Sequence, residues 1–497
     1  MIKRIIAAML ICLLFAAPAF AAGNDMPHRF PDLTESAEIA PDEVMADVLG
    51  VSLEVYRTIR EKLYDAIRNF EDEADISEFG LEHCEDSETA IYSMLLGGEP
   101  LFYYLCDYEV FPSEDGMIEK VCFTYNVEKG SRRHLYYEET IEKVSGMLLD
   151  GIEGNDSLTD LQKALLLHDR LASYCNFTKS YLLSSTDTAV DHNVIGAFVR
   201  KECVCQGYAY AYRYLLNRAG IGNYYCLSEE LNHIWNAVYI DGIPYYVDVT
   251  WDDSLDKSAV YHLDFMCSYG LISEQGHSDD FELYEVENHD EYDRMFWRKS
   301  ISQFVLLDGE VYYIDSVDCT LNKWVGDERI KVADVPGGWS DRNVQISWVN
   351  TYSVLETDGD YLYYSTPYTI VRFNPRTGTT RTVYMYEPCE DDLFFNIYGF
   401  DIDGDDLYVD VLNSPSYLNF VNYGSVDIKL TFEVPDIAGD ADGDGNITMK
   451  DILLMRRALA GAFGLKEKEA ACADYDSSGD VNMKDVLAVR MVLAGAE

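Results

Sequence analysis

Apolar side chains recur at helical spacing through the first part of the chain. The pattern predicts three helices, over residues 41–49, 52–70 and 138–149. Ser52 can cap the second, in which Tyr56, Ile59 and Leu63 belong to one apolar stripe. Two runs of aromatic and β-branched residues, 100–105 and 117–126, predict strands. We expect these elements to form an N-terminal α+β region over 23–150 that flanks the next domain.

Two further helices are predicted from about residue 160. One runs from Asp160 to Ser173, where Thr159 and Gln162 form a capping-box pattern, and His168 on its apolar stripe is expected to be a core histidine. The other starts at or near Cys205 and ends before Gly220. Unsatisfied N–H groups at a helix start favour a thiolate and can receive a substrate oxyanion. Cys205 is therefore a candidate nucleophile.

A hairpin is predicted immediately after this helix. Asp241-Gly242 separates two β-rich runs, and a two-residue turn there places Ile240 opposite Ile243. In that register His233 and Asp248 are diagonal neighbours on one face, because strand side chains alternate with period two. An Asp that accepts from one ring nitrogen leaves the other to take a thiol proton. Taken singly, the Cys also fits a buried small hydrophobe and the His a surface residue, whereas an Asp inside an aromatic strand is unusual on either interpretation.

Three short segments carry a family resemblance: 204–209 around Cys205, 233–238 from His233, and 246–253 around Asp248. Together they resemble the motifs of the bacterial transglutaminase-like superfamily. The resemblance implies a papain-like α+β core with Cys205 as nucleophile, His233 as base and Asp248 as orienter, in a catalytic domain over 151–297. Cys203 departs from the usual pattern and raises the question of a disulfide with Cys205. For the second oxyanion donor, Gln206 and the backbone N–H of Cys205 are candidates, and His192 is a candidate cleft residue.

Residues 298–434 change character. A phrase beginning Asp-Gly and continuing into a Tyr- or Val-rich run occurs at Asp308, Asp358 and Asp403, and helical periodicity is nearly absent. The spacing predicts an all-β accessory domain, either propeller-like or a sandwich. Its tyrosines are expected to pack on strand faces, with stacking on carbohydrate or protein as the alternative.

The C-terminal region contains the same loop pattern twice. Each loop places oxygen-bearing side chains at positions 1, 3, 5, 9 and 12, a carbonyl at position 7 and Gly at position 6, as calcium loops do. The first loop offers Asp440, Asp442, Asp444, Asn446, Thr448 and Asp451, and the second offers Asp474, Asp476, Ser478, Asp480, Asn482 and Asp485. Helices are predicted after the loops, over 452–459 and 486–493. Two calcium ions are therefore expected as cofactors of these loops, and no cofactor is expected for catalysis.

These two loops resemble a type I dockerin over 437–497. The resemblance implies a small all-α calcium-binding domain, a cohesin module of a scaffoldin as partner, and a place in an extracellular cellulosome-like complex. It also implies which residues contact the cohesin: Met449, Lys450, Met483, Lys484, Arg456, Arg457 and Arg490. Because the Met-Lys pairs are identical in the two halves, two inverted docking poses are expected.

Composition narrows the setting. Residues 1–22 read as a secretory signal peptide, with Lys3-Arg4 before an apolar run and small residues at its end. A net charge of −50 over 497 residues disfavours binding to nucleic acid or to an anionic membrane surface. Twelve cysteines include Cys12 in the signal, which leaves eleven with no zinc-like spacing. A secreted protein with neither nucleic-acid nor membrane partners is expected.

The sequence as a whole predicts a multidomain α+β protein that is a cysteine acyl-transfer enzyme acting on protein or peptide amides. Hydrolysis is the favoured outcome. Protein cross-linking and a non-catalytic binding component of a polysaccharide-degrading complex are the alternatives.

Overall fold

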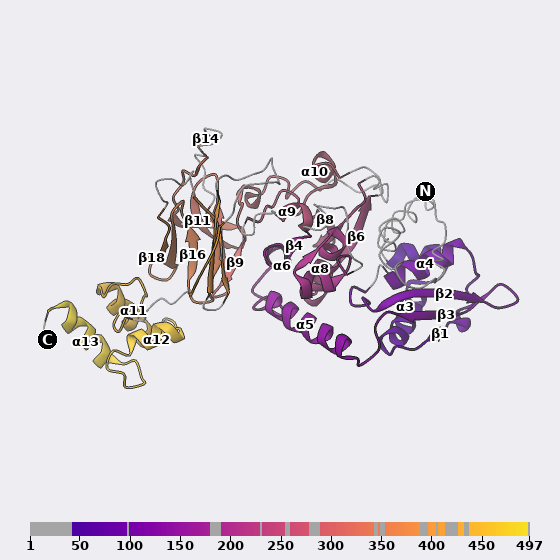
Figure 1. Cartoon of the computed structure of the whole chain (residues 1–497), viewed down its shortest axis with the longest axis horizontal. Coiled ribbons are helices and arrows are strands. Elements are labelled where there is room, and N and C mark those ends of the chain that lie inside the picture. The colour runs from indigo at the N-terminus through magenta and orange to yellow at the C-terminus, as the bar shows by residue number, and fades with distance from the viewer. Residues whose placement is uncertain are drawn as a thin grey trace. The chain divides into compact units, whose positions relative to one another are not determined.

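The computed structural model describes residues 42–96, 99–178, 190–228, 231–253, 259–277, 289–341, 346–347, 353–387, 396–403, 406–412, 426–431 and 437–495. The predicted signal peptide lies outside these residues. The chain divides into two compact units (Figure 1), the first Met1–Leu255 with Leu263–Met295 and the second Asp256–His262 with Phe296–Glu497. Within the described ranges no helix has both the length and the apolar character needed to cross a membrane.

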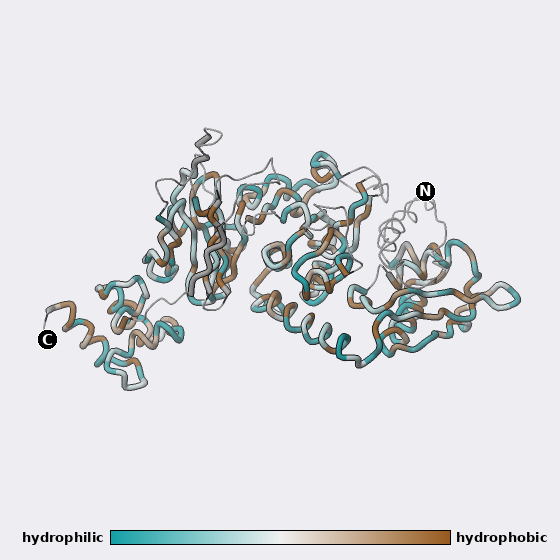
Figure 2. Tube along the Cα trace, in the orientation of Figure 1, coloured by the Kyte–Doolittle hydropathy of each residue, from teal (hydrophilic) through white to brown (hydrophobic). Residues whose placement is uncertain are grey.

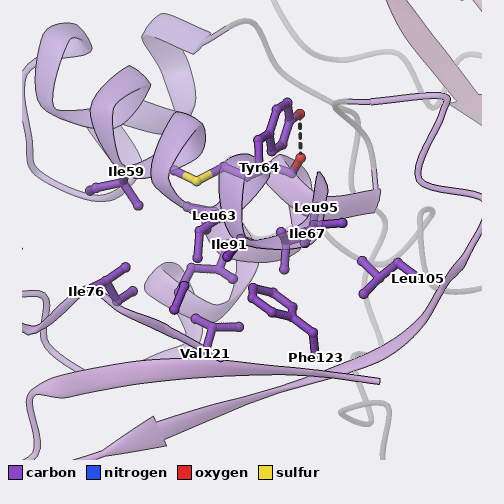
Figure 3. Packing of buried hydrophobic residues seen from close by; sticks show 14 of the residues in the cluster. Ile59, Leu63, Tyr64, Ile67, Ile76, Ile91, Leu95, Leu105, Val121 and Phe123 are labelled. Carbon is purple, nitrogen blue, oxygen red and sulfur yellow. Dashed lines mark hydrogen bonds between the residues drawn. The ribbon is translucent and has the colours of Figure 1, made fainter. Parts of the chain in front are cut away.

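The first unit opens with helices packed on a small antiparallel sheet. The helices are α2 (Asp42–Val48), α3 (Leu53–Arg68), the 3-10 turn η3 (Ser77–Phe79) and α4 (Glu85–Leu96). The strands β1 (Glu73–Asp75), β2 (Leu105–Pro112) and β3 (Ile118–Tyr125) pair in the order β1-β3-β2. Figure 3 shows Leu63 and Ile67 of α3 in one cluster with Val121 and Phe123 of β3. The Tyr64 hydroxyl donates to the Met94 carbonyl at 2.8 Å, which ties α3 to α4.

Two predictions in this region differ from the structure. The strand predicted over 100–105 is wrong, because turns occupy 100–104 and β2 begins at Leu105. Phe102 and Tyr104 are buried there, so their hydrophobicity reflects packing of a turn into the core. The helix predicted over 138–149 is longer, since α5 (Arg132–Leu149) begins where the Ser131 side chain accepts from the His134 N–H.

The remainder of the first unit carries the predicted reactive residues. Its helices are α6 (Asp160–Tyr174), the π-helical turn η4 (Gly196–Arg200), α8 (Cys205–Arg218), α9 (Val249–Asp252) and α10 (Tyr269–Glu274). Its strands are β4 (Asn176–Phe177) with β5 (Glu202–Cys203), and β6 (Asn223–Ser228), β7 (His233–Ile240) and β8 (Ile243–Val247) in one antiparallel sheet. The capping box of Thr159 and Gln162 is present at the start of α6, as predicted.

The hairpin prediction is confirmed. In β7 and β8, Ile240 pairs with Ile243 and Asn236 pairs with Val247. Asp241 and Gly242 form the turn with φ of 52° and 81°, the left-handed values that a tight two-residue hairpin turn requires. The hairpin thereby places His233 at the first residue of β7 and Asp248 directly after β8.

The second unit contains three successive antiparallel meanders after the 3-10 turn η5 (Phe296–Lys299). The first has β9 (Val305–Leu307), β10 (Glu310–Asp315), β11 (Thr320–Val325) and β12 (Glu328–Asp334). The second has β15 (Leu355–Thr357), β16 (Leu362–Ser365), β17 (Thr369–Asn374) and β18 (Thr379–Met385). The third has β19 (Asn396–Asp403), β20 (Asp406–Leu412) and β21 (Val426–Thr431). A short pair, β13 (Ser340–Asp341) and β14 (Ile346–Ser347), lies between the first and second meanders in sequence.

The repeated Asp-Gly phrase joins the first two strands of each meander; Gly404 and Asp405 of its third copy lie outside the described residues. The middle sheet is covered on both faces. Leu362 and Tyr364 of β16 pack with residues of the first meander, whereas Tyr363 packs with residues of the third. This alternation is the period-two pattern of a strand, and it stacks the sheets face to face.

The C-terminal segment is helical. It contains α11 (Met449–Leu459), α12 (Glu467–Ala473) and α13 (Met483–Leu493), and Figure 2 shows α13 as hydrophobic along most of its length. The two predicted helices end where expected but begin three residues earlier than predicted. Thr448 and Asn482 cap them, and Asp451 and Asp485 complete capping boxes.

A matched pair of glycine substitutions tests the packing beneath Cys205. A Cβ on Gly207 in α8 would lie 2.4 Å from Cys203 Cβ and 2.8 Å from the Asp191 carbonyl oxygen, whereas one on Gly146 in α5 would meet nothing within 4 Å. We expect Gly207→Ala to destabilise the first unit by about 1–3 kcal/mol, and Gly146→Ala to leave it unchanged or stabilise it by up to about 1 kcal/mol. Differential scanning calorimetry of the full chain measures both. A Gly207→Ala midpoint equal to wild type would contradict the described packing.

Candidate active site and calcium-binding loops

Cys205 occupies the first residue of α8 and is partly exposed. Val204 precedes the helix, and no side chain caps this N-terminus. The Asn236 side-chain amide on β7 donates to the Ala209 carbonyl on α8 at 3.1 Å, which fastens the helix to the hairpin. The helix start thus presents a thiol together with backbone N–H groups that favour negative charge.

His233 connects Cys205 to Asp248. Its Nε2 contacts Asp248 Oδ2, as the hairpin register predicted, and Cys205 lies near enough to raise the pKa of the same imidazole. A carboxylate can only accept, so Nε2 carries the proton and Nδ1 is the ring nitrogen left for the thiol. The structure therefore brings all three predicted residues together around the imidazole of His233.

Asp248 is almost completely buried, with 1 % of its surface exposed, and its charge is compensated on both oxygens. Oδ1 accepts from the backbone N–H groups of Thr250 at 2.9 Å and Trp251 at 3.3 Å, so Asp248 is the N-cap of α9. Burial alone would raise the pKa of this carboxyl, but His233 and a second histidine, His277, outweigh burial and hold it well below its usual range. A charged carboxylate is thus maintained inside the fold.

The imidazole of His233 makes stacked contacts with two indole rings. Trp235 stacks at a centroid distance of 5.7 Å and Trp251 at 5.6 Å. Burial lowers the pKa of His233, but the charges of Asp248 and Cys205 outweigh it and raise the pKa to about 10. His233 is consequently protonated at neutral pH and faces Cys205 as an imidazolium, the partner that favours a thiolate.

His277 is a buried residue beside Asp248 that sequence reasoning missed. Its Nε2 lies 2.9 Å from Asp248 Oδ2, the same oxygen that His233 contacts. The ligand atoms of His233, Asp248 and His277 lie within 4.8 Å of one another, as in a metal site. However, both imidazoles approach one carboxylate oxygen at hydrogen-bonding distance. No sequence motif around His277 predicts its contact with Asp248.

The neighbouring candidates have other partners. Cys203, whose pairing with Cys205 was in question, is fully buried with its Sγ 3.3 Å from Cys175 Sγ. Gln206 lies between His192, at 3.1 Å from its Oε1, and Tyr210, to whose hydroxyl its amide donates at 3.0 Å. The side chain of Gln206 therefore has hydrogen-bond partners on both its oxygen and its nitrogen.

His168 has the structural role that its position on the apolar stripe predicted. Its Nδ1 lies 2.7 Å from Asp169 and its Nε2 3.3 Å from Asp252, all fully buried. Burial lowers the pKa of His168, but these two carboxylates raise it to about 9. The contact of His168 with Asp252 joins α6 to α9, which is the helix that Asp248 caps.

The two C-terminal loops have the same internal hydrogen bonds. In the first, Asp440 Oδ2 accepts from Gly445 N–H at 2.8 Å, and Asp451 Oδ1 accepts from Asp442 N–H at 3.0 Å. In the second, Asp474 Oδ2 accepts from Gly479 N–H at 2.7 Å, and Asp485 Oδ1 accepts from Asp476 N–H at 3.2 Å. These bonds leave other carboxylate oxygens of both loops converging.

The convergent oxygens fit a hard cation. Asp440, Asp442 and Asp451 place oxygens within 4.8 Å of one another, as do Asp474, Asp476 and Asp485. Asp440 Oδ1 and Asp442 Oδ2 are buried without a hydrogen-bond donor among the described residues. Burial and the nearby Asp451 and Asp444 raise the pKa of Asp442 to about 7. Oxygen-only donor sets of this kind suit calcium.

Comparison with known families decides the nature of this segment. Residues 438–494 match the model of the dockerin type I domain. The C-terminal segment is a type I dockerin. A dockerin implies a cohesin module as partner and membership of an extracellular, cellulosome-type assembly, and dockerins of this type bind calcium.

The dockerin helices present matching exposed faces. Met449 on α11 is 63 % exposed and Met483 on α13 is 60 % exposed, and Leu453 and Leu487 follow them on the same outward faces. Lys450, Lys484, Arg456, Arg457 and Arg490 are exposed as well. The predicted partner-binding residues of the dockerin are therefore accessible in this chain.

Weak similarity is found to solved structures, among them the following two. One is a crystal structure of a TGase, with 13% identity and a TM-score of 0.22, and the alignment covers 29% of this chain and 44% of that one. The other is a protein of Cytophaga hutchinsonii assigned as a cysteine protease, with 14% identity and a TM-score of 0.18, covering 29% of this chain and 61% of that one. The chain thus spans less than two thirds of either neighbour. No curated protein matches it.

The charged state of His233 makes a prediction about stability and pH. A histidine whose pKa rises from about 6.5 to about 10 on folding contributes stability that is complete below about pH 6.5 and is lost as pH rises through 10. The stability difference between wild type and His233→Gln should therefore be largest near pH 6 and shrink steadily toward pH 10. Thermal unfolding of both proteins across this range measures it. A difference that grows with pH would contradict an imidazolium at this position.

Proposed function

We propose that this protein is a secreted transglutaminase-like cysteine enzyme that acts on amide bonds of proteins or peptides. The proposal adopts a papain-like catalytic domain over 151–297 and the triad Cys205, His233 and Asp248. The single observation that carries it is the placement of His233, which contacts the buried Asp248 carboxylate and lies near the Cys205 thiol at the start of α8.

The geometry supports a two-step acyl transfer. The Cys205 thiolate attacks the amide carbonyl carbon, and backbone N–H groups at the start of α8 receive the charge that develops on oxygen. His233 then gives its proton to the leaving amine, and the C–N bond breaks to leave a thioester on Cys205. Water, deprotonated by His233, attacks the thioester and releases the acid together with the free thiol.

Hydrolysis is the proposed outcome of the second step. Replacement of water by a lysine amine would give an isopeptide instead, so cross-linking uses the same residues up to the thioester. A non-catalytic binding component would need none of this chain of contacts. The three alternatives therefore differ in what Cys205 does to an added protein.

Docking through the dockerin supplies the location. We propose two bound calcium ions, one held by Asp440, Asp442, Asp444, Asn446, Thr448 and Asp451 and one by Asp474, Asp476, Ser478, Asp480, Asn482 and Asp485. Thr448 and Asn482 also cap the helices that begin with the Met-Lys pairs. Calcium would thus stabilise the exposed faces that meet a cohesin of a scaffoldin, and each face would suffice for one docking pose.

The enzymatic proposal predicts loss of reaction on removing the thiol. Mature protein and its Cys205→Ala variant are incubated with an extracellular protein extract, and mass spectrometry scores new termini and Gln–Lys isopeptides. New termini should fall by roughly 10³-fold or more in the variant, because the nucleophile is gone. Isopeptides in their place would identify a cross-linker.

Cys106→Ala is the matched control, since Cys106 is an exposed thiol on β2 and lies outside the proposed site. It should retain wild-type activity. Identical spectra for wild type and Cys205→Ala would reject catalysis and favour a docked binding component.

The calcium proposal predicts a change in stoichiometry. Calorimetric titration should give two ions for the wild type and one each for Asp440→Asn and Asp474→Asn, because each change removes a charged ligand from one loop. Asp480→Asn is the control, since only its backbone carbonyl is assigned to the ion, and it should retain two. Two ions in Asp440→Asn would contradict the assignment.

The docking faces are tested by measuring the affinity of the full chain and its variants for a cohesin module. Alanine at Met449 and Lys450 should leave most of the affinity, because Met483 and Lys484 provide the second pose. Loss of binding from one pair alone would reject two poses.

A further inference from the structure

His277 has a contact pattern that the proposed triad does not explain. It follows α10 in sequence and is almost completely buried, although nothing in the proposed acyl transfer uses it. Its ring lies 4.6 Å from that of Trp235 and 4.2 Å from that of Trp251, the two indoles that also flank His233. A buried imidazole in an aromatic environment is costly unless it hydrogen-bonds.

Within the described residues, the one hydrogen bond of its side chain is to the orienter, Asp248. Nε2 lies 2.9 Å from Asp248 Oδ2, whereas Nδ1 lies 4.0 Å from Asp264 Oδ1, beyond hydrogen-bonding distance. Since a carboxylate only accepts, His277 Nε2 carries a proton and donates it to the oxygen that also accepts from His233. Asp248 thus divides one oxygen between two imidazoles.

We infer that His277 is a positioning residue of the site, which rests on the proposed function and deepens it. It fixes Asp248 Oδ2 toward His233 and weakens the hold of that oxygen on the His233 proton. The second effect follows because a carboxylate oxygen that accepts two hydrogen bonds is a weaker acceptor for each. His233 must later release its proton to the leaving amine, so a moderated carboxylate suits the step.

Within the described residues, three charged or titratable groups lie near His277. Asp248 follows β8, Asp264 lies in the segment before α10, and His233 on β7 has its ring centroid 5.8 Å away. Cys205 acts on His233. Removing a donor from Asp248 leaves more negative charge facing His233, so protons on both His233 and Cys205 are held more tightly. Loss of His277 should accordingly move the reactivity of Cys205 to higher pH.

The test follows alkylation of Cys205 by iodoacetamide, which needs no knowledge of the substrate. Full-length mature protein is labelled from pH 4 to 10, and the tryptic peptide 202–213 is quantified, with fragmentation separating Cys205 from Cys203. Three variants are compared with wild type: His277→Asn, His277→Gln and His134→Gln. Glutamine can place an amide nitrogen near the position of Nε2, whereas asparagine is too short to reach it.

In His277→Asn we expect the pH profile of Cys205 labelling to shift toward higher pH by about half a unit or more. His277→Gln should restore the wild-type profile, because it again donates to Asp248. His134 is a buried histidine on α5 with its own acidic partner, Glu138, and its replacement by Gln should change nothing. A merely structural role would lower the folding transition without this difference between Gln and Asn.

The outcomes separate the two claims. Enhanced, pH-dependent Cys205 labelling in wild type, with coincident profiles in the Asn and Gln variants, overturns the role of His277 and leaves the proposed function standing. Wild-type labelling no faster than that of a free thiol overturns both. A profile that changes when EDTA is added would mean that an ion links these side chains, and it overturns the hydrogen-bond assignment.

Discussion

The burial of one carboxylate organises the first unit. An ionised carboxyl removed from water is very unfavourable unless its lone pairs are satisfied, and Asp248 meets this requirement with two backbone N–H groups and two imidazoles. Its Oδ1 caps α9, while its Oδ2 faces β7 and the segment after α10. Several elements therefore have to be in place before the charge is compensated, and the same contacts orient His233 toward Cys205.

A buried histidine with two carboxylate partners also supports this arrangement. His168 lies between Asp169 and Asp252, and the second of these carboxylates also accepts from the N–H groups of Leu263 and Asp264. The Asp248 N–H in turn donates to the Asp264 carbonyl at 2.9 Å. Helix α6, helix α9 and the following segment are thus held by polar contacts, where rearrangement would leave a buried charge unpaired.

The carboxylates of the dockerin are compensated in a different way. Its loops concentrate carboxylates, and Asp440 Oδ1 and Asp442 Oδ2 are buried without donors among the described residues. A divalent cation compensates such a cluster, whereas Asp248 is compensated by the protein itself. One chain therefore contains acidic sites of two kinds, and the partner that each carboxylate needs distinguishes them.

The sequence by itself determined the features that depend on short-range spacing. The hairpin register around Asp241-Gly242, the capping boxes at Thr159 and in the dockerin, and the position of Cys205 at a helix start all follow from neighbours within a few residues. Only the tertiary structure decided the rest. The apolar residues Phe102 and Tyr104 belong to a turn that packs into the core, and not to a strand. His277 contacts Asp248, from which it is separated by 29 positions in the sequence. Contacts of that range are fixed by how elements pack, so no local pattern of residues records them.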